Sequence, residues 1–301
     1  MRHRGGWPWH SYDRASRENP CLVRDAPTVA GSSREFFVSL PRPRHPCRAQ
    51  RSAADRQGRR RNRRLQRHRP ATARRLAADG AAVALLGRRA ERLRALADEL
   101  GPTTTAPILL VTTDLADPKA IDTAARTITA TLGPVDLVVA NAGVMLGAPY
   151  ETAHTEEWDR MIDVNLRGLL HTARVHRRSS RCRGQGRPAD LVHVGSVAGH
   201  SLYPGWSVCC ATKSAVAHLT RNLRAELGPR GVRGKNIEPG VTVTELGHDM
   251  RDISMQTSRP RMRTDLRPLT AEDIADTIAF AVSVPAHVNG AELVVVPVQQ
   301  G

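Results

Sequence analysis

The sequence predicts an α/β protein in which a doubly wound parallel sheet forms a single domain, preceded by an irregular N-terminal extension. From Ala71 onward, short apolar runs alternate with longer amphipathic segments, whereas residues 1–70 keep no hydrophobic period and are rich in Arg, Pro, Ser and His. Charge divides the chain in the same way, because residues 1–75 contain 20 Arg and 5 acidic residues and so carry +15 of the net charge of +16. We therefore expect residues 1–70 to be a basic, disordered leader and residues 71–301 to be the folded domain.

The elements of this domain follow from periodicity and turn residues. Ala71–Asp79 has the pattern of a helix end and is followed by Gly80. The next helix, Ala90–Leu100, places its leucines on one face, and Pro118 suits the first turn of another. Apolar runs of buried-strand length are expected to form strands at Ala81–Leu86, Pro107–Thr113, Val135–Asn141, Leu191–Ser196, Val232–Glu238 and Ala291–Pro297. Helices are expected at Ala90–Leu100, Pro118–Leu132, Glu156–Val175, Ser207–Leu227 and Ala271–Val284. A sheet of this kind binds its ligand at the carboxyl ends of its strands.

Composition excludes several protein classes. The five cysteines are odd in number and none forms a Cys-x-x-Cys pair, which argues against a disulfide framework or a metal site and for a reducing cytoplasm. They are Cys21, Cys47, Cys182, Cys209 and Cys210. No apolar run approaches the length of a membrane span, and the first thirty residues lack the apolar core of a signal peptide.

Polar motifs follow the predicted strands in a particular order. The strand ends carry Asp114-Leu115, Asn141-Ala142-Gly143, Ser196, and Pro239-Gly240 with Thr242 and Thr244. Asn165 lies in the long helix, and Lys213 stands four residues after Cys209. In order and spacing this set resembles the short-chain dehydrogenase/reductase family, over about three quarters of the chain. The resemblance implies a Rossmann-type fold and hydride transfer between a nicotinamide cofactor and a small carbonyl or alcohol substrate.

The resemblance also implies a role for each of these residues. In the family, the Asn141–Gly143 motif supports the sheet beside the cofactor, and Asp114-Leu115 contacts the adenine. The turn from Pro239 to Thr244 holds the nicotinamide. Ser196 holds the substrate oxygen, Lys213 binds the ribose and tunes the acid, and Asn165 helps to organise a proton-relay water. The segment Leu246–Leu269 corresponds to the family's variable substrate lid, and the family is often dimeric or tetrameric.

Two arginines follow the strand Ala81–Leu86, where the family has an acidic residue that favours NAD. Arg88 and Arg89 can instead pair with a 2′-phosphate, so we predict NADP over NAD. The alternative is that both arginines merely begin a solvent-exposed helix.

The first departure from the family concerns the catalytic tyrosine of its Tyr-x-x-x-Lys motif. Cys209 occupies that place, four residues before Lys213. A thiol can titrate, but it is shorter than tyrosine by a whole ring, and we expect it not to reach the same oxygen. Tyr203 lies before the helix and is not expected to substitute. Loss of a general acid costs about 10²–10⁴-fold in rate.

The second departure is the absence of the first strand and its glycine-rich loop, which should precede Ala71. Residues 57–70 stand there instead, and they contain seven arginines between Arg59 and Arg69. If Gln57–Arg69 is written in suitable codons and read one base later, it becomes KVAVVTGASSGIG, the family's strand and loop. We interpret the segment as that motif read out of frame, with the frame restored near Pro70. A genuine basic arm is the alternative.

Three functional hypotheses remain open from the sequence. The first is an NADP-dependent oxidoreductase, impaired in this chain; the second is an inactive or frame-shifted remnant of one. The third, which we disfavour because the arm from Arg59 to Arg69 lacks interleaved aromatic residues, is a nucleic-acid-binding protein. The sequence does not identify the substrate.

Overall fold

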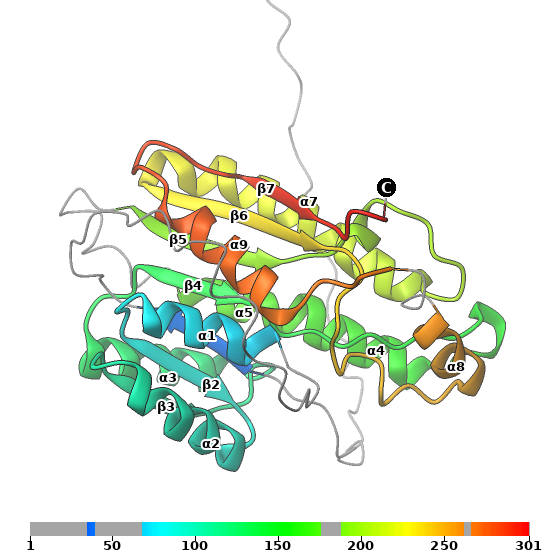
Figure 1. Cartoon of the computed structure of the whole chain (residues 1–301), viewed down its shortest axis with the longest axis horizontal. Coiled ribbons are helices and arrows are strands. Elements are labelled where there is room, and N and C mark those ends of the chain that lie inside the picture. The colour runs from blue at the N-terminus through cyan, green and yellow to red at the C-terminus, as the bar shows by residue number, and fades with distance from the viewer. Residues whose placement is uncertain (1–34, 40–67, 176–187, 262–265, 301) are drawn as a thin grey trace, which may run out of the picture. The chain divides into compact units, whose positions relative to one another are not determined.

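A computed structural model describes residues 35–39, 68–175, 188–261 and 266–300, which lie in one compact unit spanning Ser32–Gly301. A seven-stranded sheet in the order β3-β2-β1-β4-β5-β6-β7 forms its centre (Figure 1). The strands are β1 (Glu35–Ser39), β2 (Val83–Gly87), β3 (Ile108–Thr112), β4 (Leu137–Ala140), β5 (Ala189–Val194), β6 (Val232–Pro239) and β7 (Glu292–Val295).

The predicted doubly wound parallel sheet is confirmed for β2 to β7. The pairs β2–β3, β4–β5, β5–β6 and β6–β7 are all parallel. The chain builds β2 and β3 on one side of β1 and then returns to build β4 to β7 on the other side. In open α/β sheets, such a change of direction marks the ligand crevice.

The central strand β1 was not expected. It pairs antiparallel with both neighbours, so that Phe37 lies opposite Leu85 of β2 and Val139 of β4. The prediction of a leader outside the fold is therefore wrong for Glu35–Ser39, as is the prediction that the sheet lacks its central strand. The gap between β2 and β4 presents backbone groups that need partners, and a short β-forming run can satisfy them even though it is too short to build a core alone.

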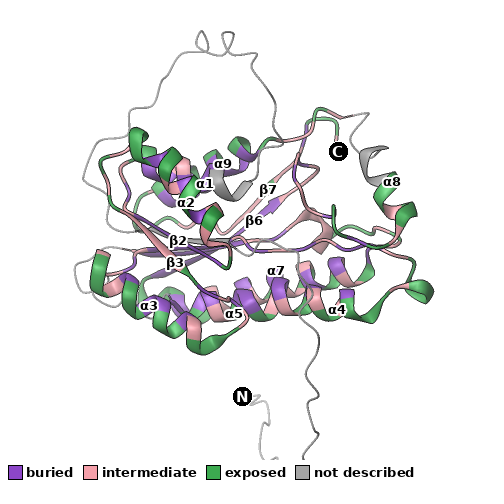
Figure 2. Ribbon diagram, turned by 90° about the horizontal axis from the view of Figure 1, so that it is seen from below, coloured by how far each residue is buried: buried purple, intermediate pink, exposed green. Residues whose placement is uncertain are grey.

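Helices cover both faces of the sheet (Figure 2). The helices α1, α2 and α9 lie on one face, and α3, α4, α5 and α7 lie on the other. Their bounds are α1 (His68–Ala78), α2 (Ala90–Leu100), α3 (Pro118–Leu132), α4 (Thr155–Ile162), α5 (Gly168–Ala173), α7 (Ser207–Leu227), α8 (Ile253–Arg261) and α9 (Ala271–Ser283). Thus α1 starts three residues earlier than the predicted domain boundary and includes Pro70, whose ring is tolerated in a first turn.

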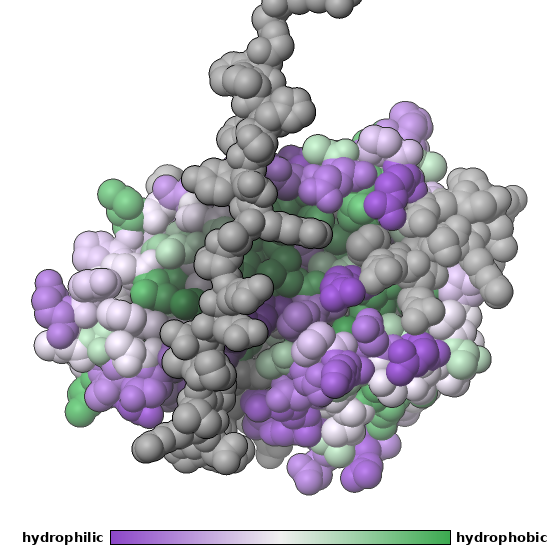
Figure 3. Space-filling model, turned by 180° about the vertical axis from the view of Figure 1, so that it is seen from behind, coloured by the Kyte–Doolittle hydropathy of each residue, from purple (hydrophilic) through white to green (hydrophobic). Residues whose placement is uncertain are grey.

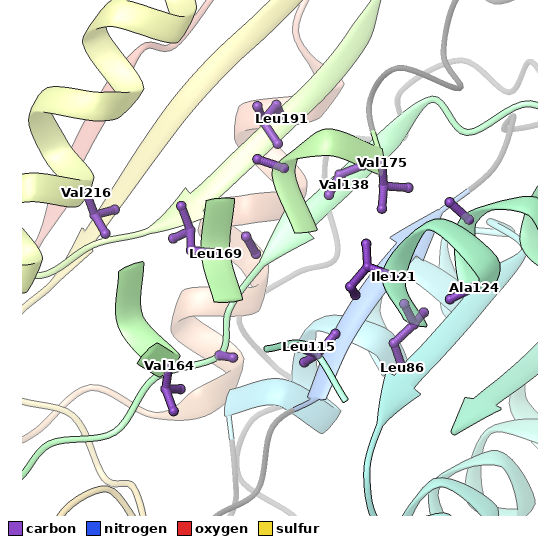
Figure 4. Close-up of a cluster of buried hydrophobic side chains, with 14 of the residues drawn as sticks. Leu86, Leu115, Ile121, Ala124, Val138, Val164, Leu169, Val175, Leu191 and Val216 are labelled. Atoms are coloured by element: carbon purple, nitrogen blue, oxygen red, sulfur yellow. The ribbon is translucent and has the colours of Figure 1, made fainter. Parts of the chain in front are cut away.

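Each central strand sends alternate side chains into two apolar clusters. On β2, Val83 and Leu85 pack with α1, α2 and α9, while Ala84 and Leu86 pack with α3, α5 and α7. Figure 4 shows the second cluster, in which Leu86, Val138 and Leu191 of the strands lie near side chains from the helices. Burial on both faces explains why these strands are continuous apolar runs in the sequence.

The predicted helix Glu156–Val175 is divided in three. The π-helical turn η4 (Asp163–Arg167) separates α4 from α5 and buries Asn165 together with Val164. Turns of this kind often occur at functional sites. The lid segment contains α8, which the sequence did not predict.

On the face of the molecule shown in Figure 3, apolar side chains gather near the centre and hydrophilic ones around the rim. None of the described helices combines the length and the apolar character that a membrane span requires.

Candidate active site

The carboxyl ends of the parallel strands lie along one edge of the sheet. The strands β2 and β4 both run antiparallel to β1 and hence parallel to each other, and β3, β5 and β6 share their direction. The predicted site residues follow these ends at Arg88, Asp114, Asn141, Ser196 and Pro239. The structure therefore places all the predicted strand-end motifs on one edge.

Ser196 and Lys213 both lie at the end of β5. Ser196 caps the short helix η6 (Val197–Gly199): its Oγ accepts a hydrogen bond from the Ala198 amide at 3.1 Å and lies 3.5 Å from the Pro239 carbonyl oxygen at the end of β6. Lys213 Nζ donates to the Val194 carbonyl at 3.0 Å, two residues before Ser196. A Cβ built on Gly143 would lie 3.8 Å from the same ammonium. The serine, the lysine and the Asn141–Gly143 turn thus border one place.

Asn165 fixes the loop after β4 to the start of α7. Its Oδ1 accepts from the Val144 amide at 2.8 Å, and its Nδ2 donates to the Val144 carbonyl at 3.0 Å and to Thr212 Oγ1 at 3.1 Å. Thr212 donates in turn to the Cys209 carbonyl at 2.8 Å. Sequence reasoning missed Thr212, because a hydroxyl within a helix carries no pattern that marks it.

Cys209 lies in the first turn of α7, where its side chain is 6% exposed. Burial raises the pKa of its thiol to about 11, although the nearby Lys213 ammonium acts in the opposite direction. The thiol therefore keeps its proton at neutral pH. It belongs to the same apolar cluster as Val144, Leu146 and Trp206, and half-buried Tyr203 packs against that cluster from the segment before α7. A shielded thiol thus lies one helical turn before Lys213.

The turn after β6 is stabilised by hydrogen bonds that its own threonine hydroxyls make to the backbone. Thr242 Oγ1 donates to the Gly240 carbonyl at 2.8 Å, and Thr244 Oγ1 accepts from the Leu246 amide at 3.0 Å. The side chain of Gln300 closes over this turn and accepts from the Val241 amide at 2.8 Å. A Cβ on Gly240 would overlap Gln300 Oε1, so the side chain of Gln300 sits directly against this glycine. Nothing in the sequence pattern pointed to Gln300.

The other half of the crevice carries the residues expected at the adenine. Arg88 is exposed at the end of β2, and Arg89 is the residue before α2. Asp114 Oδ1 accepts from the Ala116 amide at 3.0 Å, and Leu115 is buried. Of the segment interpreted as a shifted glycine loop, Gln57–Arg69, residues 57–67 lie outside the described residues, and the last two begin α1.

The residues present can accept a polar cofactor at the nicotinamide end. Within the described residues, the buried amide nitrogen of Asn141 has no hydrogen-bond partner, and the bare Gly143 leaves room in front of the Lys213 ammonium. A buried donor of this kind gains when a ligand supplies an acceptor. In the described part of the chain, no group of three His, Cys, Asp or Glu side chains is placed to hold a metal ion.

Known proteins resemble this chain over the same region. The family model described as short chain dehydrogenase matches residues 70–254. Sulfoacetaldehyde reductase 2 of Chromohalobacter salexigens is 36% identical over 231 residues, covering 76% of this chain and 90% of that protein. Serine 3-dehydrogenase of Agrobacterium fabrum is also 36% identical over 231 residues, covering 76% of this chain and 89% of that protein.

A solved structure gives the same result for the fold. The closed form of serine dehydrogenase complexed with NADP+ is 31% identical, has a TM-score of 0.69, and covers 78% of this chain and 92% of that one. Together with the shared edge occupied by Asn141, Ser196, Lys213 and Pro239, these matches establish that the chain belongs to the short-chain dehydrogenase/reductase family of oxidoreductases.

Proposed function

We propose that this chain is an NADP-dependent oxidoreductase that interconverts a small carbonyl compound and its alcohol. The observation that carries the proposal is the junction at the end of β5, where Lys213 Nζ holds the Val194 carbonyl and Ser196 Oγ faces the Pro239 carbonyl. The bound cofactor would supply or accept the hydride. Ser196 would hold the substrate oxygen, Lys213 the ribose, and the turn from Pro239 to Thr244 the nicotinamide.

Two arginines support NADP as the cofactor. Arg88 and Arg89 follow β2 at the crevice edge, where a guanidinium can make paired hydrogen bonds to a 2′-phosphate. We expect Arg88→Asp to weaken NADPH binding relative to NADH by about tenfold or more, as for the loss of a charge-assisted bond. The matched control is Arg94→Asp, which makes the same change at an exposed position of α2. If the affinity for NADPH relative to NADH is the same in both variants, Arg88 does not select NADP, and NAD becomes the favoured cofactor.

The buried thiol is expected to slow proton transfer but not to prevent cofactor binding. Cys209 holds its proton in an apolar cluster, so the chain would bind cofactor and substrate but turn over slowly. Asn165 would support a proton relay from its position beside Thr212. The second hypothesis, an inactive remnant, predicts no turnover at any substrate concentration.

We further propose that residues 57–69 are the family's first strand and glycine loop read out of frame. Two findings support this proposal: the family match begins at residue 70, and the central sheet position is occupied by a distant, antiparallel segment. Sequencing the DNA over codons 50–72 tests it directly. A single inserted or deleted base on each side of the segment is expected.

The function is tested by measuring NADPH binding through fluorescence and NADPH oxidation with a panel of aldehydes and ketones that includes sulfoacetaldehyde. We expect Lys213→Gln to abolish binding, and Lys119→Gln, at an exposed site on α3, to leave it unchanged. The proposal fails if the two variants bind NADPH alike.

A homodimer or homotetramer is a further part of the proposal. The strand β7 forms an edge of the sheet, and it exposes Val294, with Val298 exposed just beyond it. Exposed apolar residues at a sheet edge suit pairing with another copy. Light scattering should give a mass of two or four chains, and Val294→Lys should lower it.

A further inference from the structure

The carboxylate of Glu238 is buried beside the site, although no role described so far uses it. Its side chain is 1% exposed and lies one residue before Pro239, at the end of β6. A buried carboxylate is costly unless it is hydrogen-bonded. In the described part of the chain, the carboxylate is hydrogen-bonded to two side chains, those of His200 and Asn236.

The first partner fastens the far end of the loop that carries Ser196. His200 follows η6, four residues after Ser196, and its Nε2 lies 2.8 Å from Glu238 Oε2. The histidine is 42% exposed, whereas the carboxylate that it meets is buried. The loop is thereby joined to β6 at the residue next to the nicotinamide turn.

The second partner lies against the near end of the same loop. Asn236 Nδ2 donates to Glu238 Oε1 at 2.6 Å. The side chain of Asn236 lies under Gly195, where an added Cβ would be 2.5 Å from Asn236 Oδ1. Gly195 immediately precedes Ser196. Because it has no side chain, the backbone at the end of β5 can lie directly against Asn236, which donates to the carboxylate.

We infer that Glu238, through His200 on one side and Asn236 on the other, positions the Ser196 hydroxyl for the substrate oxygen. The segment from Gly195 to His200 is then joined to the carboxylate directly at His200, and at Gly195 it lies against Asn236, which donates to the same carboxylate. From the opposite side, Ser214 Oγ on α7 donates to the Gly199 carbonyl at 2.8 Å. The loop is held between β6 and α7, and the direction of Ser196 Oγ toward Pro239 follows from that. The inference rests on the proposed function only for the use of Ser196.

The Ala198 amide reports this positioning without any need for turnover, because it donates to Ser196 Oγ itself. Its hydrogen exchange can be measured by NMR on the intact chain, together with NADPH binding and the melting temperature. We expect His200→Ala to speed exchange at Ala198 about 10- to 100-fold, as for the loss of a hydrogen bond to a charged group. Ser196→Ala sets the fully released rate.

His200→Gln is the conservative variant, because its amide can still donate to Glu238. It should restore slow exchange at Ala198, and Glu238→Gln should give an intermediate rate. An unchanged Ala198 rate in His200→Ala would overturn the inference. So would equal acceleration throughout β5 and β6, which would indicate general destabilisation. Failure of NADPH binding with the exchange pattern intact would instead count against the proposed function alone.

Discussion

The two ends of the crevice differ in the direction of the strands that border them. At the nicotinamide end, β4, β5 and β6 each run toward the crevice and deliver a polar motif at their carboxyl ends. At the phosphate end, β1 runs the other way: Glu35 lies opposite Gly87, and Ser39 opposite Val83. The chain therefore leaves β1 at the edge opposite the crevice. Ladder hydrogen bonds accept almost any extended segment, but only a strand of the right direction places a loop where the cofactor binds.

This contrast shows that a strand can complete the hydrogen bonding of the sheet without completing the cofactor site. The antiparallel β1 satisfies the backbone groups of β2 and β4 and so stabilises the domain. A parallel strand in the same position would end at the crevice and lead directly into α1. Residues 40–67 instead connect Ser39 to His68, the first residue of α1.

The largest effect is expected from Cys209→Tyr in a chain whose residues 57–69 are replaced by KVAVVTGASSGIG. Turnover should rise about 10²–10⁴-fold over the loop-replaced chain that keeps Cys209, because a phenol supplies the proton that the buried thiol withholds. Steady-state reduction of a ketone measures this.

The same substitution in the original chain should recover much less activity, since the phosphate end would remain unrepaired. A matched control is Cys210→Tyr, one position further along the helix and half-buried. Full activity of the single Cys209→Tyr variant would show that the two ends of the crevice do not need to be repaired together.

The next effect is on cofactor affinity. Replacing Gln57–Arg69 with KVAVVTGASSGIG should strengthen NADPH binding about 100-fold, as two backbone hydrogen bonds to a charged phosphate would. Fluorescence titration gives the dissociation constant, and a scrambled version of the insert is the control. Tight NADPH binding by the original chain would mean that the Arg-rich segment already binds the cofactor phosphates in place of the glycine loop.

A third change tests whether β1 belongs to the sheet in solution. Val38 lies opposite Ala84 and Val138, so Val38→Pro should break a ladder on at least one side. An orphaned buried backbone group costs about 1–3 kcal/mol, and urea denaturation should show a loss of this size. Unchanged stability would restore the view of residues 35–39 as part of a leader.

The smallest effect concerns a group of charges at the start of β7. Glu292 on β7 accepts from Arg221 at 2.9 and 2.8 Å and from Arg224 at 2.9 Å, and these hydrogen bonds lower its pKa to about 2. Because the folded-state pKa is depressed, the stabilisation is complete above about pH 4.5 and is lost as the pH falls toward 2. Solvent screening limits it to about 1 kcal/mol.

Melting curves between pH 6 and pH 2 should therefore fall more steeply for the original chain than for Glu292→Gln. Glu272→Gln, an exposed position in the first turn of α9, serves as the control for an acidic residue elsewhere. Identical slopes for the original chain and Glu292→Gln would show that the arginines add nothing.

Much of the fold was predictable, because strands buried on both faces are continuous apolar runs and the polar motifs sit where those runs end. The strand at Glu35–Ser39 was not, since five residues carry too little periodicity to distinguish a strand from a loop. Its pairing partners lie far away in the sequence, as the match of Val38 with Val138 shows.

In the site, Ser196, Lys213 and Asn165 could be singled out because the order and spacing of the motifs resemble those of the family. Other contacts could not be found in this way. Glu238 was placed in a strand, and Asn236 stands two residues before it on that strand, but His200 is brought to it only by the turn that follows β5. Gln300 reaches the nicotinamide turn from just beyond β7, 59 residues away in the sequence.

The place of β1 in the sheet also bears on how the domain unfolds. Within the described sheet, β2 and β3 on one side and β4 to β7 on the other are hydrogen-bonded to each other only through this strand. Its partners are distant in sequence, so its docking requires closure of long loops and is expected late in folding. A chain that has lost β1 would hold two smaller sheets linked by helix packing. We therefore expect one five-residue segment to decide whether the domain melts in a single cooperative transition.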